Sequence, residues 1–199
     1  AALAAIALGG LGLAVAIRSD SDLKKLIETA PVAWDTEHHQ GWLDEKKYGL
    51  PVLPSGAAVD YSAYMRIAWL KQGLLIIGEH PLGIGFGRNA YGHGLKAKYG
   101  EGRGHSHSGL LDLAIGTGVP GTLLWLGFFV SLMRLAWKRS RATHSHAAIL
   151  LMLLLLDFGA RMFLDSIIRD HMLQQFLFLA GLVAVMMASE SPEKRKASA

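Results

Sequence analysis

Apolar stretches long enough to cross a membrane recur along the chain. Residues 1–17, 113–133 and 172–189 contain no charged side chain, and residues 147–164 are apolar except for Asp157 and Arg161. A helix needs roughly 20 apolar residues to cross the hydrocarbon core of a bilayer. The pattern therefore predicts an all-α polytopic membrane protein with about four transmembrane helices.

A large, partly helical loop is expected between the first two of these helices. It spans residues 18–108, far more than an ordinary connection, and should contain structure of its own. The stretch DYSAYMRIAWLKQGLLIIGEHP offers Asp60 or Ser62 as an N-cap and Pro81 as a stop. Its apolar residues recur at helical spacing, which predicts an amphipathic helix against the membrane or the bundle. This apolar stripe comprises Tyr61, Met65, Ala68, Trp69, Leu75 and Ile76.

The earlier part of the same loop is expected to be less regular. The stretch SDSDLKKLIETAP is typical of a short helix that closes before Pro31. The residues that follow mix Trp34, Trp42 and Tyr48 with charged residues and turn formers. We expect a solvated loop whose aromatic side chains rest at the level of the lipid headgroups.

Lysine and arginine residues set the expected orientation, because short cytoplasmic loops hold the excess of these residues. They gather in the connector RLAWKRSRATHSH and in the tail that holds Lys194, Arg195 and Lys196. Both segments should therefore be cytoplasmic, and the long loop should face the periplasm of a bacterium. The expected order is a transmembrane helix at 1–17, a periplasmic loop at 18–108, a transmembrane helix at 109–137, a cytoplasmic loop at 138–146, a transmembrane helix at 147–164, a periplasmic turn at 165–170, a transmembrane helix at 171–189 and a cytoplasmic tail at 190–199.

Net charge and composition narrow the functional classes. The formal charge of +4 is largely this topological signal, so nucleic-acid binding is not expected. The sequence contains no cysteine, which excludes disulfides and thiol chemistry. Because its first residues already have the pattern of a membrane helix, we expect the chain to be the C-terminal part of a longer protein.

Candidate chemistry gathers in the polar stretch HPLGIGFGRNAYGHGLKAKYGEGRGHSHSG, directly before an apolar run. Its first glycines lack the flanking strand and helix of a nucleotide-binding fingerprint, so they predict a tight turn instead. His105 and His107 could bind a metal, but the nearest acids, Glu101 and Asp112, make no convincing third ligand. Amphipathic histidines at a membrane interface are the alternative interpretation.

His107-Ser108-Gly109-Leu110-Leu111, followed by six residues and Gly118, matches the pattern H-[NSQ]-x-x-L-x(6)-G. With the upstream HPLGIGFG and the arginine-bearing helix before it, this stretch resembles the O-antigen ligase family. That family shares its domain with O-antigen polymerases and protein O-oligosaccharyltransferases. The resemblance implies transfer of a polysaccharide from undecaprenyl diphosphate to a hydroxyl of lipid A-core at the periplasmic face of the inner membrane, without metal, nucleotide or other cofactor.

The resemblance also suggests roles for individual residues. His107 is the motif histidine and the expected general base, and Arg66 falls close to the family arginine of the preceding helix. Other arginines are candidates for binding the diphosphate by location only. Arg88 and Arg103 lie near the motif, and Arg161 and Arg169 alternate with Asp157 and Asp165 at every fourth residue. That alternating stripe could equally serve only to orient a helix.

Two further functional classes stay open at this stage. A polymerase or a protein O-oligosaccharyltransferase would use the same donor with a different acceptor. A non-catalytic subunit of a membrane transporter would use its histidines and glycines only to shape a pore or an interface. The polar cluster lies at one surface and the chain shows no obvious repeat, which favours surface chemistry over transport.

Overall fold

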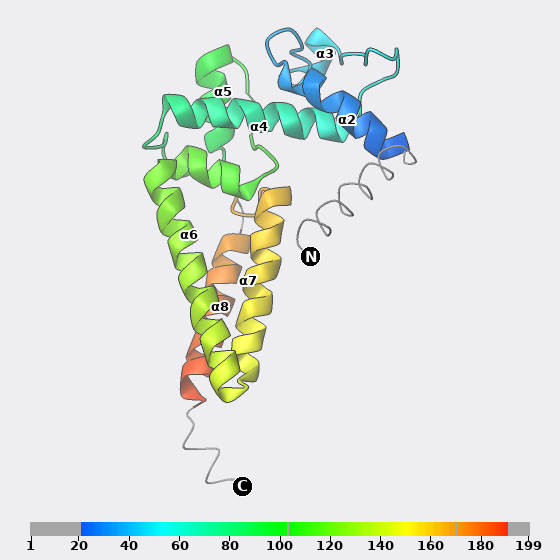
Figure 1. The fold of residues 1–199 in the computed structure, drawn as a ribbon. Coiled ribbons are helices and arrows are strands. Elements are labelled where there is room, and N and C mark those ends of the chain that lie inside the picture. Colours follow the sequence, from blue (N-terminus) through cyan, green and yellow to red (C-terminus); the bar gives the residue numbers. More distant parts are fainter. Residues whose placement is uncertain (1–20, 103, 170, 191–199) are drawn as a thin grey trace. The chain divides into compact units, whose positions relative to one another are not determined.

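The computed structural model describes residues 21–102, 104–169 and 171–190, and in this part of the chain every regular element is a helix. The only strand-like pairing there is an isolated antiparallel bridge between Val52 and Ala58. The predicted all-α class is therefore confirmed. The helices are α2 (Ser21–Trp34), α3 (Glu45–Tyr48), α4 (Tyr61–Glu79), α5 (Ala90–Tyr99), α6 (Gly109–Thr143), α7 (His146–Leu164) and α8 (Met172–Ser189) (Figure 1). They divide into two units, with the boundary between Gln72 and Gly73.

The first unit has its own core, which contains the buried side chains of Trp42, Tyr64 and Trp69. Trp42 is 1 % exposed and donates from its indole N–H to the carbonyl of Thr36 at 3.2 Å. The indole of Trp69 donates to the carbonyl of Trp42 at 3.1 Å, and the buried Tyr64 donates its hydroxyl to His39 O at 3.0 Å. These bonds satisfy the polar ends of large buried side chains. The segment between α2 and α4 is therefore folded around α4.

This core corrects the expectation of a solvated aromatic loop. Trp34 and Tyr48 are exposed as expected, but Trp42 is buried because its ring fills the space beside α4. The helix expected to close before Pro31 instead continues to Trp34. Pro31 has no N–H to donate to the carbonyl of Ile27, but the helix continues for one more turn, and Asp35 N donates to Pro31 O at 3.2 Å where it ends.

The amphipathic helix predicted before the glycine motif is α4. Ala63 N donates to Asp60 Oδ1 at 2.8 Å, so Asp60 is the cap, and the helix ends just before Pro81 as expected. Four of the six predicted stripe residues are buried, whereas Tyr61 and Leu75 are exposed. The polar Gln72 is buried in the stripe, where its amide donates to Thr36 Oγ1 at 2.8 Å.

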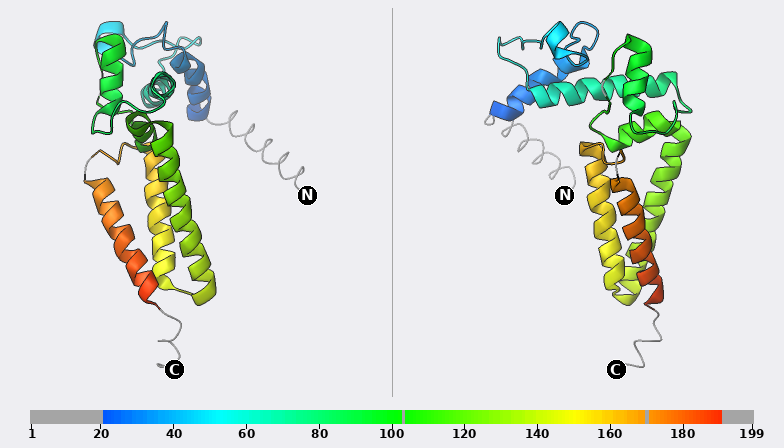
Figure 2. Two further views of the ribbon diagram at one scale, coloured as in Figure 1. Left: turned by 90° about the vertical axis from the view of Figure 1, so that its left-hand side faces the viewer. Right: turned by 180° about the vertical axis from the view of Figure 1, so that it is seen from behind.

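In the second unit, α6 packs on α7, and α7 packs on α8 (Figures 1 and 2). Among the described residues these three helices are long and apolar enough to cross a membrane. Phe158 of α7 stacks on Phe176 of α8, with ring centroids 3.9 Å apart. Other large apolar side chains, such as Leu124 and Phe178, point outward and are well exposed, as lipid-facing residues of a spanning bundle must be. The remaining predicted span, at residues 1–17, is the first along the chain and lies outside the described residues.

The helix of the second span is longer than expected. It continues past residue 137 to Thr143, and His144 ends it in a left-handed conformation with its N–H on Ser140 O at 2.9 Å. The stripe of Asp157, Arg161, Asp165 and Arg169 does not form, because α7 ends at Leu164 and Asp165 is extended. The last two of these residues therefore lie beyond the helix.

A break in α6 at Gly118 is the main irregularity of the second unit. Gly118 has φ 70° and ψ −174°, and the first turns of α6 run in a different direction from the rest (Figures 1 and 2). In an unbroken helix, Ile115 O would accept from residue 119 and Gly116 O from residue 120. Residue 120 is a proline without an N–H, so the carbonyl of Gly116 would have no helical donor.

The glycine-rich segment after α4 supplies the missing partners. Ile84 N donates to Ile115 O at 3.0 Å, and Gly85 N donates to Gly116 O at 3.1 Å. In return Val119 N donates to Pro81 O at 2.8 Å. The predicted glycine turn is therefore a backbone clasp on the broken helix, which we call the glycine clasp (residues 81–85 against 115–119).

We expect Gly118→Ala to destabilise the second unit. Its Cβ would lie 2.3 Å from the carbonyl carbon of Leu82, and its backbone would keep a φ that L-residues avoid. An extended conformation at positive φ is essentially restricted to glycine and costs other residues about 1–3 kcal/mol, and overpacking costs about 1–3 kcal/mol more. Thermal unfolding in detergent should show a clear fall in midpoint. Gly127→Ala in the same helix is the control, because its Cβ meets nothing within 4 Å and should raise or preserve the midpoint. Equal midpoints for the two variants would contradict the clasp.

Candidate functional site

A short turn before α6 carries both histidines of the motif. His107 has φ 58°, a left-handed conformation that is uncommon for residues other than glycine. The side chain of Ser106 holds the turn closed through the backbone of Ser108. Ser106 Oγ donates to Ser108 O at 3.0 Å and accepts from Ser108 N at 3.2 Å. We call residues 105–108 the histidine turn.

Two further contacts anchor the histidine turn to the bundle. Ser108 is the N-cap of α6, and its hydroxyl also donates to Met162 O in the last turns of α7 at 3.3 Å. Gly109 N donates to Asp165 O, just beyond α7, at 2.8 Å. A side chain on Gly109 would crowd that carbonyl, with its Cβ at 3.2 Å. The turn is thus fixed to the end of the α6 and α7 pair.

The two imidazoles lie next to each other. The ring centroids of His105 and His107 are 4.3 Å apart and the rings are tilted by 40°. Both side chains are partly buried. Burial lowers the pKa of His105, and the positive charge of Arg169 lowers it further. His105 is therefore neutral at pH 7, and a neutral imidazole can accept a proton.

Arg169 forms the other side of this cluster. Its Nε donates to Arg88 O at 3.2 Å, and its terminal nitrogen is 3.4 Å from Asn89 Oδ1. Gly104 lies against the same pair, since a Cβ there would be 3.1 Å from Asn89 Oδ1. The chain thus reaches Arg88 and Asn89 within four residues of the glycine clasp, and both contact Arg169 there.

A buried carboxylate lies beneath the histidine turn. Asp112, in the first turn of α6, is 5 % exposed, and its Oδ1 accepts from Ser106 N at 3.1 Å. Its Oδ2 is buried and has no hydrogen-bond partner among the described residues. Its negative charge also acts on Tyr91 of α5, a fully buried side chain whose pKa is raised first by burial and then by Asp112.

The structure brings together some of the residues singled out in the sequence. His107, Arg169 and the backbone of Arg88 belong to one cluster. Arg161 is exposed in the last turn of α7. Arg66 is exposed on α4 in the first unit. Arg103 lies outside the described residues.

Sequence reasoning missed three members of the site. Nothing in the sequence marks Asn89 or Tyr91 as a site residue, since a lone amide and a lone tyrosine near glycines are ordinary loop and helix residues. The position of Asp112 could have indicated a role. An acidic residue four positions after a serine cap lies at the helix N-terminus, where its charge is favourable, and an acid that begins an apolar run is unusual.

Within the described residues, no three histidine, aspartate or glutamate side chains converge as metal ligands would. The two motif histidines are adjacent, but the nearby Asp112 uses one oxygen on the Ser106 amide. The metal interpretation therefore finds no ligand set in that part of the chain.

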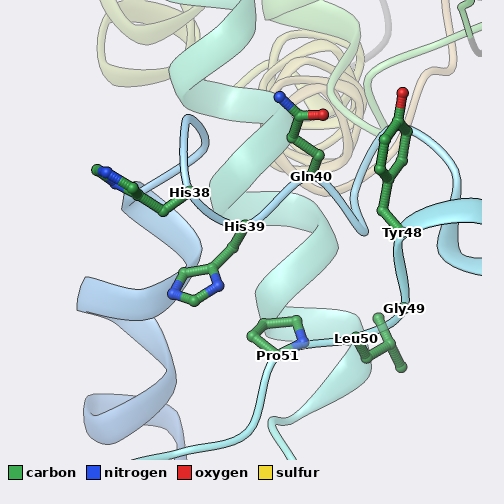
Figure 3. Close-up of a pocket in the computed structure, with 7 residues that line it drawn as sticks. All are labelled: His38, His39, Gln40, Tyr48, Gly49, Leu50 and Pro51. Atoms are coloured by element: carbon green, nitrogen blue, oxygen red, sulfur yellow. The ribbon is translucent and has the colours of Figure 1, made fainter.

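The first unit contains a separate small pocket of about 170 Å³. Figure 3 shows the chain from His38 to Gln40 on one side and from Tyr48 to Pro51 on the other. His38 at its rim pairs with Asp35, with Nδ1 and Oδ1 2.9 Å apart, which raises the pKa of the imidazole and lowers that of the carboxyl. None of the catalytic or diphosphate-binding candidates from the sequence lines this pocket.

A comparison with family models identifies one match that covers most of the chain. The model described as O-antigen ligase matches residues 1–126, which include the glycine clasp and the histidine turn. No curated protein sequence matches the chain, and no solved structure matches it either.

Proposed function

The chain belongs to the O-antigen ligase family, and from that premise we propose that it transfers a polysaccharide from undecaprenyl diphosphate to a hydroxyl of lipid A-core. The family makes it a membrane-bound glycosyltransferase, and the spanning helices agree with that class. The observation that carries the finer proposal is the histidine pair on a fixed turn at the end of a membrane helix, beside Arg169.

The proposed reaction needs only a base and a cationic site for the leaving group. The acceptor oxygen bonds to the anomeric carbon of the donor, and the bond from that carbon to the diphosphate oxygen breaks. The bonding electrons leave with the undecaprenyl diphosphate, and the hydroxyl proton passes to His107. Removing that proton as the new bond forms lowers the barrier, which is general-base catalysis.

Arginines are proposed to hold the diphosphate. A guanidinium has five N–H donors, and Arg169 directs donors at Arg88 O and Asn89 Oδ1 while others remain for phosphate oxygens. Arg88 and Arg161 are proposed as further diphosphate contacts by their place near the histidine turn and at the end of α7, and Arg103 by its position in the sequence, two residues before His105. Arg66 is assigned to the same donor through its similarity to the family arginine.

A lipid-linked donor and a lipid-linked acceptor meet most readily at a membrane surface. We propose that the histidine turn faces the periplasm, that the protein lies in the inner membrane, and that the end of α6 near Ser140 is cytoplasmic. The lysines and arginines around residues 134–141 support that orientation. An acceptor that is a second glycan or a protein would make the enzyme a polymerase or a protein O-oligosaccharyltransferase with the same donor.

We expect His107→Ala to lower transfer by roughly 10²–10⁴-fold while the donor still binds, because only the base is lost. His105→Ala should lose much less, and Arg66→Ala should weaken donor binding as well as rate. Transfer of labelled glycan and donor binding should be measured in the full-length protein at matched expression. His93→Ala, an exposed histidine of α5, is the control and should behave as wild type. Near-normal transfer by His107→Ala would show that His107 is not the base.

Assays with lipid A-core, glycan and protein acceptors would identify which of the three reactions the enzyme catalyses.

Transfer should survive exhaustive chelation, because arginines rather than a metal ion are assigned the charge of the diphosphate. Activity would be compared before and after dialysis against EDTA, with heat-inactivated enzyme as the blank. Loss of activity that a single divalent ion restores would contradict this assignment.

Cysteines introduced on the two sides of the membrane should differ in labelling, and the absence of native cysteine in this sequence keeps its background low. In intact spheroplasts, Glu37→Cys, an exposed position of the first unit, should react with an impermeant thiol reagent, and Ser140→Cys should react only after permeabilisation. Labelling of Ser140→Cys in intact cells would reverse the orientation.

A further inference from the structure

Asp112 is a buried carboxylate with no role in the proposed reaction. It lies on the first position after Leu111 of the motif, where the motif specifies no residue. We propose that Asp112 is the positioning residue of the histidine turn, with Oδ1 fixing the backbone that presents His107 and Oδ2 supplying negative charge to the imidazole pair as the proton arrives. This inference rests on the proposed function and deepens it.

The first part of the proposal follows from the hydrogen bond to Ser106. The amide of Ser106 lies between the two histidines, so the bond from it to Asp112 Oδ1 at 3.1 Å ties both imidazoles to the first turn of α6. A left-handed residue such as His107 persists only where its surroundings hold it. Ser106 is itself buried, which shields this bond from water. Asp112 therefore acts through the turn and not on the substrate.

The second part follows from the other oxygen. A buried polar atom without a partner costs about 1–3 kcal/mol, and more when it is charged. Oδ2 of Asp112 has no such partner, although Asp112 is almost completely buried. A carboxylate that only fixed a backbone amide could be an asparagine, which offers the same acceptor without the charge. The retained charge indicates an electrostatic task.

The surrounding groups show which side chains feel that charge. Burial, Arg169 and His107 lower the pKa of His105, while the carboxylates of Asp112 and Asp165 raise it. The fully buried Tyr91 of α5 also feels the charge of Asp112, which raises its pKa further after burial has raised it. When the acceptor proton reaches the imidazole pair, the negative charge of Asp112 would stabilise the resulting cation through space, because an opposite charge nearby favours the charged form.

Two substitutions separate the hydrogen bond from the charge. Asp112→Asn keeps an oxygen for the Ser106 amide and removes the charge, whereas Asp112→Ala removes both. The control is Ser166→Ala, which deletes the other buried side-chain oxygen without a hydrogen bond among the described residues and does not touch the turn. All variants should be made in the full-length protein and compared at equal amounts of folded enzyme.

We expect the turnover number to fall by about 10²-fold in Asp112→Ala, the typical loss when a reacting group is misplaced. Asp112→Asn should fall between this variant and wild type, and Ser166→Ala should match wild type. The donor KM should change little in all of them, because the arginines are untouched. Equal turnover in Asp112→Ala and wild type would overturn the proposal.

The pH profile tests the charge separately. Removing a negative charge near the imidazoles disfavours their protonated form, so the base stays neutral to lower pH. The acidic limb of the rate profile should therefore move to lower pH in Asp112→Asn. A residue needed only for folding would reduce the amount of active enzyme without moving the limb. Asparagine and alanine variants with equal rates and an unmoved limb would overturn the electrostatic part.

Hydrogen exchange of the peptide that contains the histidine turn gives a readout independent of activity. The Ser106 amide should exchange faster in Asp112→Ala than in Asp112→Asn, which keeps its acceptor. Unchanged exchange in Asp112→Ala would overturn the positioning role. If wild type transfers no glycan, or His107→Ala transfers normally, the proposed function fails, and the exchange result still decides whether Asp112 holds the turn.

Discussion

The break of α6 at Gly118 is the constraint on which the rest of the second unit depends. Helices in a membrane must satisfy their backbone groups internally, and a break leaves carbonyls that water cannot reach. Here Pro120 removes one donor and Gly118 turns the chain, so Ile115 O and Gly116 O need partners from outside the helix. The amides of Ile84 and Gly85 provide them. Two segments distant in sequence are thereby held backbone to backbone.

That constraint also positions the chemistry. The clasp fixes where the chain leaves α4, so Arg88 and Asn89 follow within a few residues and meet Arg169. The short first part of α6 before the break begins at the Ser108 cap and carries Asp112 on its first turn. The break at Gly118 therefore helps to position both Arg88 and Asn89 on one side of the histidine turn and Asp112 on the other. The glycines of the motif allow the two backbones to approach closely. At Gly83 and Gly118 a Cβ would lie within 2.6 Å of the opposing backbone, which explains the requirement for glycine at both positions.

Features that depend on neighbouring residues in the sequence could be predicted, and features that depend on contacts between distant segments could not. The spanning helices follow from apolar length, and the Asp60 cap and the end before Pro81 follow from local chemistry. The glycine turn was predicted, but its partner in α6 was not, since nothing local indicates where its amides go. Trp42 was misplaced at the membrane surface because an aromatic residue among charges has the same pattern whether it is solvated or packed under α4. The expected stripe through Arg169 failed because it assumed that a helix continues where Asp165 is extended.

The electrostatics of the cluster connect donor binding to proton transfer on the proposed function. Arg169 lowers the pKa of His105 and at the same time offers N–H groups to an anion. Without a donor, burial and this positive charge both favour the neutral form of His105. A bound diphosphate would offset the charge of Arg169, and its own negative charge would favour protonation of the imidazole pair. Donor binding at Arg169 would therefore raise the affinity of His105 for a proton, and so change the charge beside the proposed base His107, whose ring centroid is 4.3 Å from that of His105.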